Sequence, residues 1–181
     1  MTVSFIVPTT GERSTLAAAL QSIETLPGDE ILVVGPLLAW SDPRVRVVGC
    51  KSAHDWGASE RELGIAHARG RFLAFMDDDD VYAPNHRAVM EAAMHDAPDT
   101  PTIFRMRYPD GHVLWGDPAL VCGNVSTQMM LVPNDTDHLG SWKSGRRECD
   151  FDFLASSKWR GEAMTWRTDV ICHRSEEKYQ P

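Results

Sequence analysis

Short apolar runs alternate with an amphipathic stretch in the first 35 residues. Val3–Val7 is a β-branched and aromatic run that a proline ends, which predicts a buried strand. Residues 15–25 carry leucine and isoleucine at helical spacing, which predicts a helix with Ser14 as its N-cap. Glu30–Val34 predicts a second buried strand. Strand, helix and strand in this order indicate a parallel pair joined by a right-handed crossover.

The same alternation continues to residue 94. It predicts, in order, a strand, a helix closed by a C′ glycine, a strand and a further helix: Val45–Val48, Ala58–Arg69 with Gly70, Phe72–Met76 and Asn85–Met94. Strands and helices that alternate in this way favour an open sheet whose ligand lies at the carboxyl ends of its strands.

The second half of the chain is less regular. A Pro-Asp-Gly turn at residues 109–111 separates two apolar runs and predicts a hairpin. The predicted strands are Thr102–Met106, His112–Trp115, Gln128–Val132, Ala163–Thr168 and Val170–His173, and the predicted short helix begins at Phe151 and ends at Ser156. No break in composition demands a second domain, so we expect one α/β domain over residues 1–181.

Charge and cysteine content narrow the class of protein. The net charge of −8 argues against a general nucleic-acid binder, although it leaves room for a local basic loop at Lys143, Arg146 and Arg147. The four cysteines are widely spaced, which predicts reduced thiols: Cys50, Cys122, Cys149 and Cys172. No apolar run has the length of a membrane span, and the N-terminus lacks the features of a signal peptide. We therefore expect a cytoplasmic protein.

Four consecutive aspartates, Asp77 to Asp80, follow the predicted strand Phe72–Met76 directly. Like charges packed this closely repel one another, and a divalent cation would relieve the repulsion. Mg²⁺ and Mn²⁺ both prefer carboxylate oxygens and leave positions open for phosphate groups. The alternative is an acidic turn in which Asp79 or Asp80 caps the next helix.

A long ordered pattern leads into this run: Gly57-x-x-x-Arg61-x-x-Gly64-Ile65-x-x-Ala68-x-Gly70-x-Phe72-x-x-Phe75-Met76-Asp77-x-Asp79-Asp80, with Pro84 shortly after. It resembles the stretch before the D-x-D motif of family 2 glycosyltransferases, and Val3-Ser4-Phe5-Ile6-Val7-Pro8-Thr9 resembles the first strand of that family. The resemblance covers residues 2–85 well and the rest loosely. It implies a single GT-A-type domain, a Rossmann-like, mostly parallel mixed sheet flanked by helices. The nucleotide-sugar-binding half would cover about residues 1–85, the acceptor-side half about 86–174, and a tail 175–181.

The resemblance also implies roles for individual residues. The nucleotide sugar would contact Pro8, Thr9, Glu12, Arg61, Asp77 and Asp78. A divalent metal, Mn²⁺ or Mg²⁺, would be held by Asp79, Asp77 and His173. For Arg61 the alternative is a surface arginine paired with Glu60 or Glu62. One departure concerns the base, because the second strand ends in Val-Val-Gly-Pro where the family commonly has an acid. That acid is absent or displaced to Asp42, so the sugar donor could carry a nucleotide other than uridine.

The acceptor side offers a candidate base. The family usually places its base in a Glu-Asp pair before a short helix, and Cys149-Asp150-Phe151 matches that frame with cysteine in place of glutamate. Asp150 is then the candidate, with Glu148 and Asp152 as alternates; the other interpretation is that Asp150 caps the helix. Further expectations are that Arg174 pairs with diphosphate oxygens and that Trp142 is exposed and faces the acceptor.

These expectations predict a metal-dependent, inverting transfer of one sugar from a nucleoside-diphosphate sugar, first of all a UDP-sugar, to an unknown hydroxyl acceptor. One alternative is a sugar-phosphate nucleotidyltransferase, which would carry a glycine-rich basic loop after its first strand; residues 8–13 contain a single glycine. The other is a non-catalytic nucleotide-sugar-binding module. The missing acid after the second strand and the cysteine at position 149 favour that alternative.

Overall fold

Four parallel strands form one half of the sheet in the computed structural model, which describes residues 1–37, 39–143, 145–161 and 164–175. Strand β1 lies between β2 and β4, and β3 pairs with the outer edge of β2. Their bounds are β1 (Val3–Pro8), β2 (Glu30–Gly35), β3 (Val45–Gly49) and β4 (Phe72–Phe75). Every residue of β1 and β4 is buried, as their largely apolar sequences predict for strands covered on both faces; Ser4 is the polar exception in β1.

The second half of the chain extends the same sheet. Strand β8 pairs antiparallel with β4, so that the strand order is β3-β2-β1-β4-β8-β6-β9-β5, with β7 beside β6. The bounds are β5 (Val81–Tyr82), β6 (Thr102–Arg107), β7 (Val113–Leu114), β8 (Met130–Pro133) and β9 (Thr165–His173). Because β5 comes from the first half and pairs with β9 near the end, the two halves share one continuous sheet.

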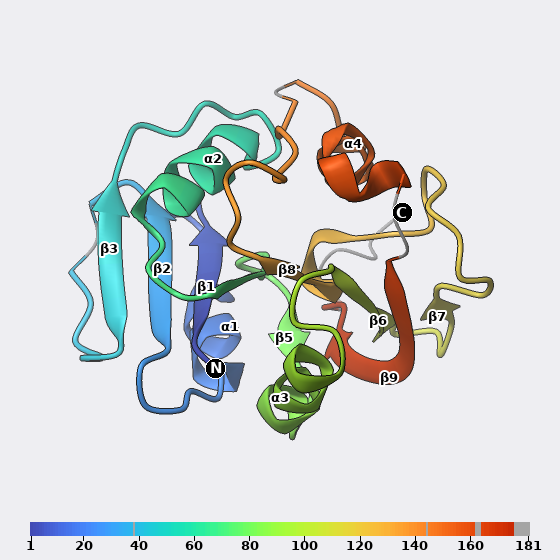
Figure 1. Ribbon diagram of the computed structural model, residues 1–181. Helices are drawn as coiled ribbons and strands as arrows, with labels where there is room; N and C mark the ends of the chain where they lie inside the picture. The colour runs from blue at the N-terminus through green and yellow to red at the C-terminus, as the bar shows by residue number, and fades with distance from the viewer. Residues whose placement is uncertain (38, 144, 162–163, 176–181) are drawn as a thin grey trace.

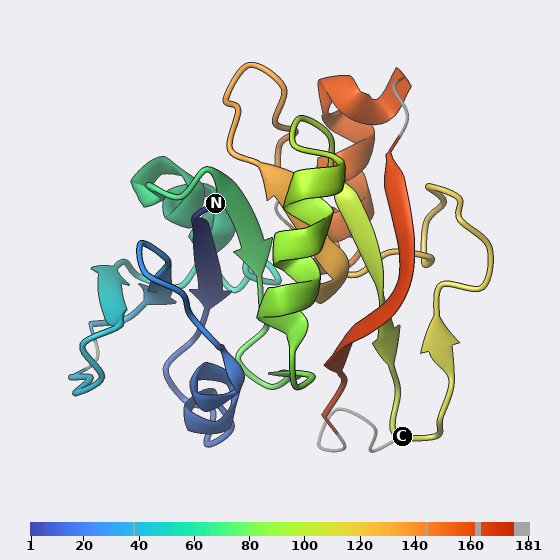
Figure 2. The same cartoon turned by 60° about the horizontal axis from the view of Figure 1, so that its bottom comes forward.

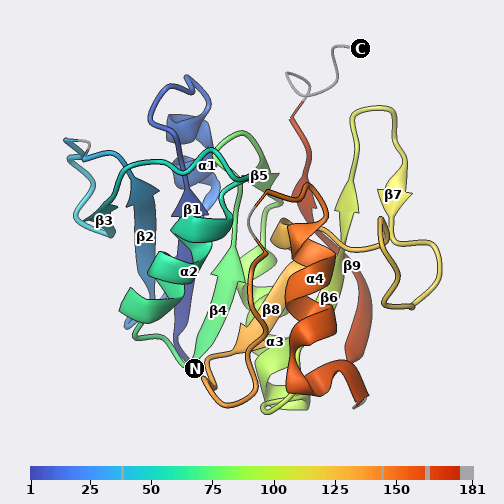
Figure 3. The same ribbon diagram turned by 90° about the horizontal axis from the view of Figure 1, so that it is seen from above.

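Helices cover both faces of the sheet (Figures 1 and 3). Helices α2 and α4 lie on one face, and α1 and α3 lie on the other, which Figure 2 brings forward. Their bounds are α1 (Leu16–Ser22), α2 (Ala58–His67), α3 (His86–Asp96) and α4 (Cys149–Ser156), with short 3₁₀ turns at Thr127–Met129 and Lys158–Gly161. The expectation of one α/β domain with a mixed sheet flanked by helices is confirmed.

Most predicted elements are present, and the differences have local causes. The strand expected over Gln128–Val132 starts as the 3₁₀ turn and becomes β8 only at Met130. The two short strands expected after residue 163 are one strand, β9, while Ala163 itself lies outside the described residues. The N-cap of α1 is Thr15 and not Ser14.

Two glycines around α2 show how tightly this helix and its neighbours pack. Gly57, just before the helix, has φ of +77°, and a Cβ there would lie 3.1 Å from a side-chain carbon of Pro8. Gly70 was expected to close the helix as a C′ glycine, which is wrong: the helix ends at His67, and its C-cap residue Ala68 has an extended backbone conformation. Gly70 is required for a different reason, because a Cβ would lie 2.5 Å from the backbone nitrogen of Ser4.

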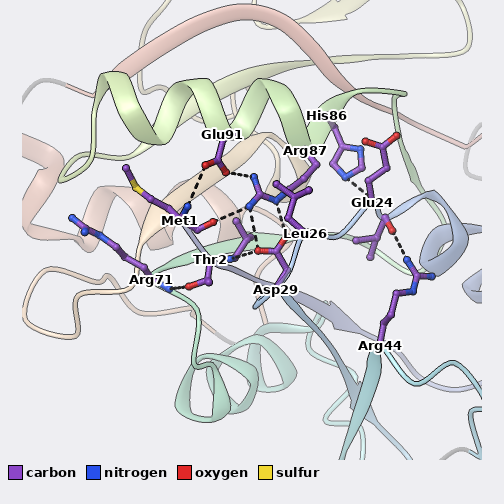
Figure 4. A network of polar contacts seen from close by, with 12 residues as sticks. Met1, Thr2, Glu24, Leu26, Asp29, Arg44, Arg71, His86, Arg87 and Glu91 are labelled. Atoms are coloured by element: carbon purple, nitrogen blue, oxygen red, sulfur yellow. Dashed lines mark hydrogen bonds and ion pairs between the residues drawn. The ribbon is translucent and has the colours of Figure 1, made fainter.

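A buried ion pair ties α3 to the loop before β2 (Figure 4). The Arg87 guanidinium donates to Asp29 from Nε at 2.7 Å and from Nη2 at 3.2 Å, and both side chains are almost fully buried. The same guanidinium donates to Glu91 and to the backbone oxygen of Met1, at 2.7 and 2.8 Å. A planar fork with five donors is the side chain that satisfies this geometry.

We therefore expect Arg87→Lys to lower the free energy of unfolding by about 1–2 kcal/mol, because lysine keeps the charge and loses the paired hydrogen bonds. Urea unfolding measures the change. Arg71→Lys is the matched control, since Arg71 is exposed and lies 3.6 Å from an exposed Asp99. Equal stability of both variants would contradict a structural role for the fork.

Candidate active site

A cavity of about 750 Å³ opens where β1 and β4 end. Its wall contains most residues predicted from the sequence: Pro8, Thr9, Arg61, Asp77, Asp78, Asp79 and Asp150. Pro8 is the last residue of β1, and Asp77 follows β4 by two positions. Carboxyl ends of neighbouring parallel strands meet at one edge of a sheet, which explains why segments far apart in sequence converge here.

Three carboxylates of the acidic run form a compact group. Asp77, Asp79 and Asp80 each offer an oxygen, and these oxygens all lie within 4.8 Å of one another. An all-oxygen donor set of this size suits Mg²⁺ or Mn²⁺. The residues present therefore fit a divalent cation, and Asp80 belongs to the group although the D-x-D pattern did not include it.

Cationic and hydroxyl side chains hold the aspartates in place. Arg61 donates to Asp77 at 2.5 Å, and Arg13 donates to Asp79 at 2.5 Å. The Thr9 hydroxyl donates to Asp78 at 2.6 Å. Burial raises the pKa of Asp78 above its usual value, against the lowering effects of the Thr9 hydrogen bond and the Arg13 charge.

Asp80 connects the acidic run to the second half of the chain and to the end of β9. One carboxylate oxygen accepts from the Gln128 side-chain amide, and the other accepts from the backbone N–H of Ser175 at 2.9 Å. The alternative in which Asp79 or Asp80 caps α3 is wrong, because Asn85 holds the N-cap position.

Arg61 lies in the cavity wall and packs against Trp142. Arg61 is 3% exposed, so the alternative of a surface arginine paired with Glu60 or Glu62 is wrong. Its guanidinium lies 4.9 Å from the centre of the Trp142 ring and donates to the backbone oxygen of Trp56 at 2.7 Å. Trp142 was expected to be exposed, which is also wrong: it is 4% exposed.

The burial of Trp142 has a local cause. Its ring stacks on Phe153 of α4 at 4.6 Å between centroids, and its backbone N–H donates to Glu62 at 2.6 Å. The polar loop thus places its aromatic residue in the core between α2 and α4, in contact with the Arg61 guanidinium.

Asp150 lines the cavity from the first turn of α4. Burial raises its pKa to about 6, opposed by the hydrogen bond from the Phe151 N–H and by the Arg61 charge. The alternative of a helix cap at Asp150 is wrong, since Glu148 precedes the helix. Of the two alternate bases, Glu148 lines the cavity, whereas Asp152 is 3.4 Å from Arg146 and is not among the described lining residues.

Three sequence candidates lie apart from this group. Glu12 is exposed and His173 sits in β9 opposite Val81. Neither is among the described residues that line the cavity, and His173 is not in the carboxylate group. Its role as a metal ligand stays a prediction. Asp42, considered as a displaced base-reading acid, accepts from Nε and Nη2 of Arg44 at the surface and is not among the described residues that line the cavity, so this suggestion gains no support.

The site also contains residues that the sequence did not single out. Arg13 and Gln128 contact the acidic run, and Glu60 lines the cavity from α2. Along the chain, Arg13 lies 66 residues from Asp79, and Gln128 lies 48 residues from Asp80. Only the register of the sheet brings them together. The positive charge of Arg13, in the loop after β1, was a signal available in the sequence.

The fold matches solved structures closely. The crystal structure of S. aureus TarS 1-349 superposes with a TM-score of 0.71 at 16% identity, covering 97% of this chain and 60% of that chain. The same TarS fragment in complex with UDP-GlcNAc superposes with a TM-score of 0.71 at 14% identity, covering 97% of this chain and 59% of that one. The chain is therefore an α/β domain of the GT-A type.

The sequence comparisons give the family. The model named Glycosyl transferase family 2 matches residues 36–151, and the chain belongs to that family. A curated relative is the Escherichia coli UDP-Glc:alpha-D-GlcNAc-diphosphoundecaprenol beta-1,3-glucosyltransferase WfgD, 30% identical over 94 residues, or 46% of this chain. The chain spans 37% of the length of that relative. Among the described residues, no helix has the length and apolar character of a membrane span.

Proposed function

We propose that this chain transfers a sugar from a uridine-diphosphate sugar to a hydroxyl acceptor, with inversion at the sugar carbon. One observation carries the proposal: the acidic group after β4 and the Asp150 carboxylate line the same cavity from opposite halves of the domain. A donor diphosphate and an acceptor hydroxyl could therefore meet between them, in a chain that belongs to glycosyl transferase family 2.

The proposed donor site lies at the ends of β1 and β4. Pro8, Thr9 and Arg61 line this part of the cavity, so a nucleoside bound here would lie beside the acidic run. Support for uridine comes from the relatives, because TarS was solved with UDP-GlcNAc and with UDP, and WfgD is named for UDP-Glc. Glu12 would have a role only at the outer margin, since it is exposed.

Asp77, Asp79 and Asp80 are the residues that would hold Mg²⁺ or Mn²⁺. A cation bound there would act as a Lewis acid that stabilises the charge developing on the leaving diphosphate. Arg174 supplies a second positive group, because it lines the cavity and stacks over Tyr108 at 5.0 Å from the ring centre. Its guanidinium has the geometry to donate to diphosphate oxygens.

Asp150 is the proposed general base. As the acceptor oxygen bonds to the anomeric carbon, its proton passes to the Asp150 carboxylate, and the bond from that carbon to the diphosphate oxygen breaks. A pKa of about 6 places the group as an ionised carboxylate at neutral pH while keeping it basic enough to take a proton. A single displacement of this kind inverts the sugar carbon.

A binding experiment with a turnover readout tests the proposal. We expect Mn²⁺ with UDP-sugars to raise the melting temperature more than Mn²⁺ with GDP- or ADP-sugars, because selective binding stabilises the native state by RT ln(1 + [L]/Kd), about 2.7 kcal/mol at 100 Kd. In the absence of an acceptor, slow hydrolysis of the UDP-sugar by water should release UDP. Pyrophosphate formed from a sugar phosphate and a nucleoside triphosphate would instead support the nucleotidyltransferase alternative, and binding without any UDP release would support a non-catalytic module.

A further inference from the structure

Glu60 is a buried carboxylate with an unsatisfied oxygen. It lies in the first turn of α2 and is 2% exposed. Oε1 accepts a hydrogen bond from the Ala53 N–H at 3.3 Å, whereas Oε2 has no hydrogen-bond partner among the residues that the structure describes. Within the described part of the chain, no cationic side chain forms an ion pair with it. A buried carboxylate in this state is costly unless something donates to it.

The position of Glu60 indicates what could donate. Glu60 lines the same cavity as the acidic run, together with Ser52 and Gly57 from the loop before α2. The hydrogen bond from Ala53 places the carboxylate against the loop between β3 and α2, and burial and, next, the charge of Glu60 raise the pKa of the Cys50 thiol in that loop. The Cys50 N–H in turn donates to the last residue of β2, Gly35, at 2.7 Å.

Glu60 therefore lies near the carboxyl ends of β2 and β3, and neither of these two strands ends in an acidic residue. Strand β2 ends in Gly35 and is followed by Pro36, and the acid considered from the sequence, Asp42, is held at the surface by Arg44. The Oε2 oxygen on α2 is thus an unpartnered acceptor that the described residues offer at this end of the cavity.

We propose that Glu60 reads the nucleobase of the donor by accepting the ring N–H of uracil on Oε2. This inference rests on the proposed use of a uridine-diphosphate sugar. Because Oε1 is already engaged by Ala53, the side chain presents one acceptor, which matches the single N3–H of uracil. Cytosine has a lone pair at N3, which would face the same carboxylate oxygen without a proton between them.

The substitution Glu60→Gln makes the inference testable. If the glutamine carbonyl accepts from Ala53, its NH₂ group faces the base as a donor, so the preference for N3–H is lost or reversed. Hydrogen bonds to charged groups contribute about 1.5–3 kcal/mol, equivalent to about 10- to 150-fold in affinity. We expect UDP affinity to fall by that factor, and the ratio of UDP to CDP affinity to fall by at least about tenfold.

Isothermal titration with Mn²⁺ and UDP, CDP or UDP methylated at N3 gives the readout. The parent should bind UDP well above the other two, and Glu60→Gln should lose most of that discrimination. Glu62→Gln is the matched control: Glu62 lies on the same helix, is exposed and accepts from the Trp142 N–H, so its variant should keep the preference of the parent. Circular dichroism of each variant checks folding.

The outcomes separate the two proposals. If no uridine nucleotide binds to the parent, the proposed function fails. If UDP binds and N3-methylated UDP binds equally well to the parent, or Glu60→Gln weakens all three ligands by the same factor, the base-reading role of Glu60 is overturned and the residue only supports the loop before α2. The comparison within the parent decides the question even if Glu60→Gln does not fold.

Discussion

Asp79→Ala is expected to reduce sugar transfer by at least about 10²- to 10³-fold, because the variant loses one of three carboxylates that converge on the proposed cation position. Mn²⁺ affinity, followed by titration of the free protein, should fall in parallel. The melting temperature of the metal-free protein should not fall, since one member of a repelling cluster has been removed. A variant with full activity and unchanged Mn²⁺ binding would contradict the assignment of the cation to this group.

Arg13 supplies a contrasting variant for the same experiment. Its guanidinium donates to Asp79 at 2.5 Å and lies 3.3 Å from Asp78, so its charge competes with a cation for these oxygens. Arg13 is about half exposed, which limits the strength of the pair. Arg13→Gln should therefore bind Mn²⁺ modestly more tightly, whereas Asp79→Ala binds it more weakly. A general loss of structure would weaken binding in both.

The fold was predictable from the sequence where burial is continuous and local. Strand β4 is apolar at every position, and Ser4 is the one polar residue of β1. Helices cover both faces of these strands, so their apolar pattern identifies them. Strand β9 is only partly buried, and its mixed sequence suggested two weak strands. Its pairing with β5 and β6 stabilises it as one strand, and such contacts leave no periodic signal in the sequence.

The candidate site residues were likewise predictable only where they belong to a local sequence pattern, and not where tertiary contacts place them. Asp77, Asp79 and Asp150 were found because acids after a strand or before a short helix have a local pattern. Trp142 was misplaced because a polar loop predicts exposure, whereas stacking on Phe153 requires knowledge of the tertiary fold. Glu60 was missed because a glutamate in a helix resembles a surface residue until its burial is known.

Asp150→Asn is expected to lower turnover by about 10²- to 10⁴-fold, the range typical of general base catalysis. Asparagine has the same shape, and its side-chain oxygen can still accept from the Phe151 N–H, which Asp150 accepts at 2.7 Å. What is lost is the ability to take the acceptor proton. Affinity for UDP should stay close to that of the parent, because the base acts on the acceptor. Steady-state rates and UDP titration separate the two effects.

The pH profile provides the sharper test of Asp150. Burial raises its pKa to about 6 in the folded protein, so the carboxylate is protonated below that pH and ionised above it. Turnover of the parent should therefore rise as pH increases through about 6 and then level off. Asp150→Asn should lose this dependence together with its activity. Asp152→Asn is the matched control, because Asp152 lies beside Arg146 and should leave the profile unchanged. If Asp152→Asn or Glu148→Gln abolishes transfer while Asp150→Asn remains active, the base is one of those neighbours.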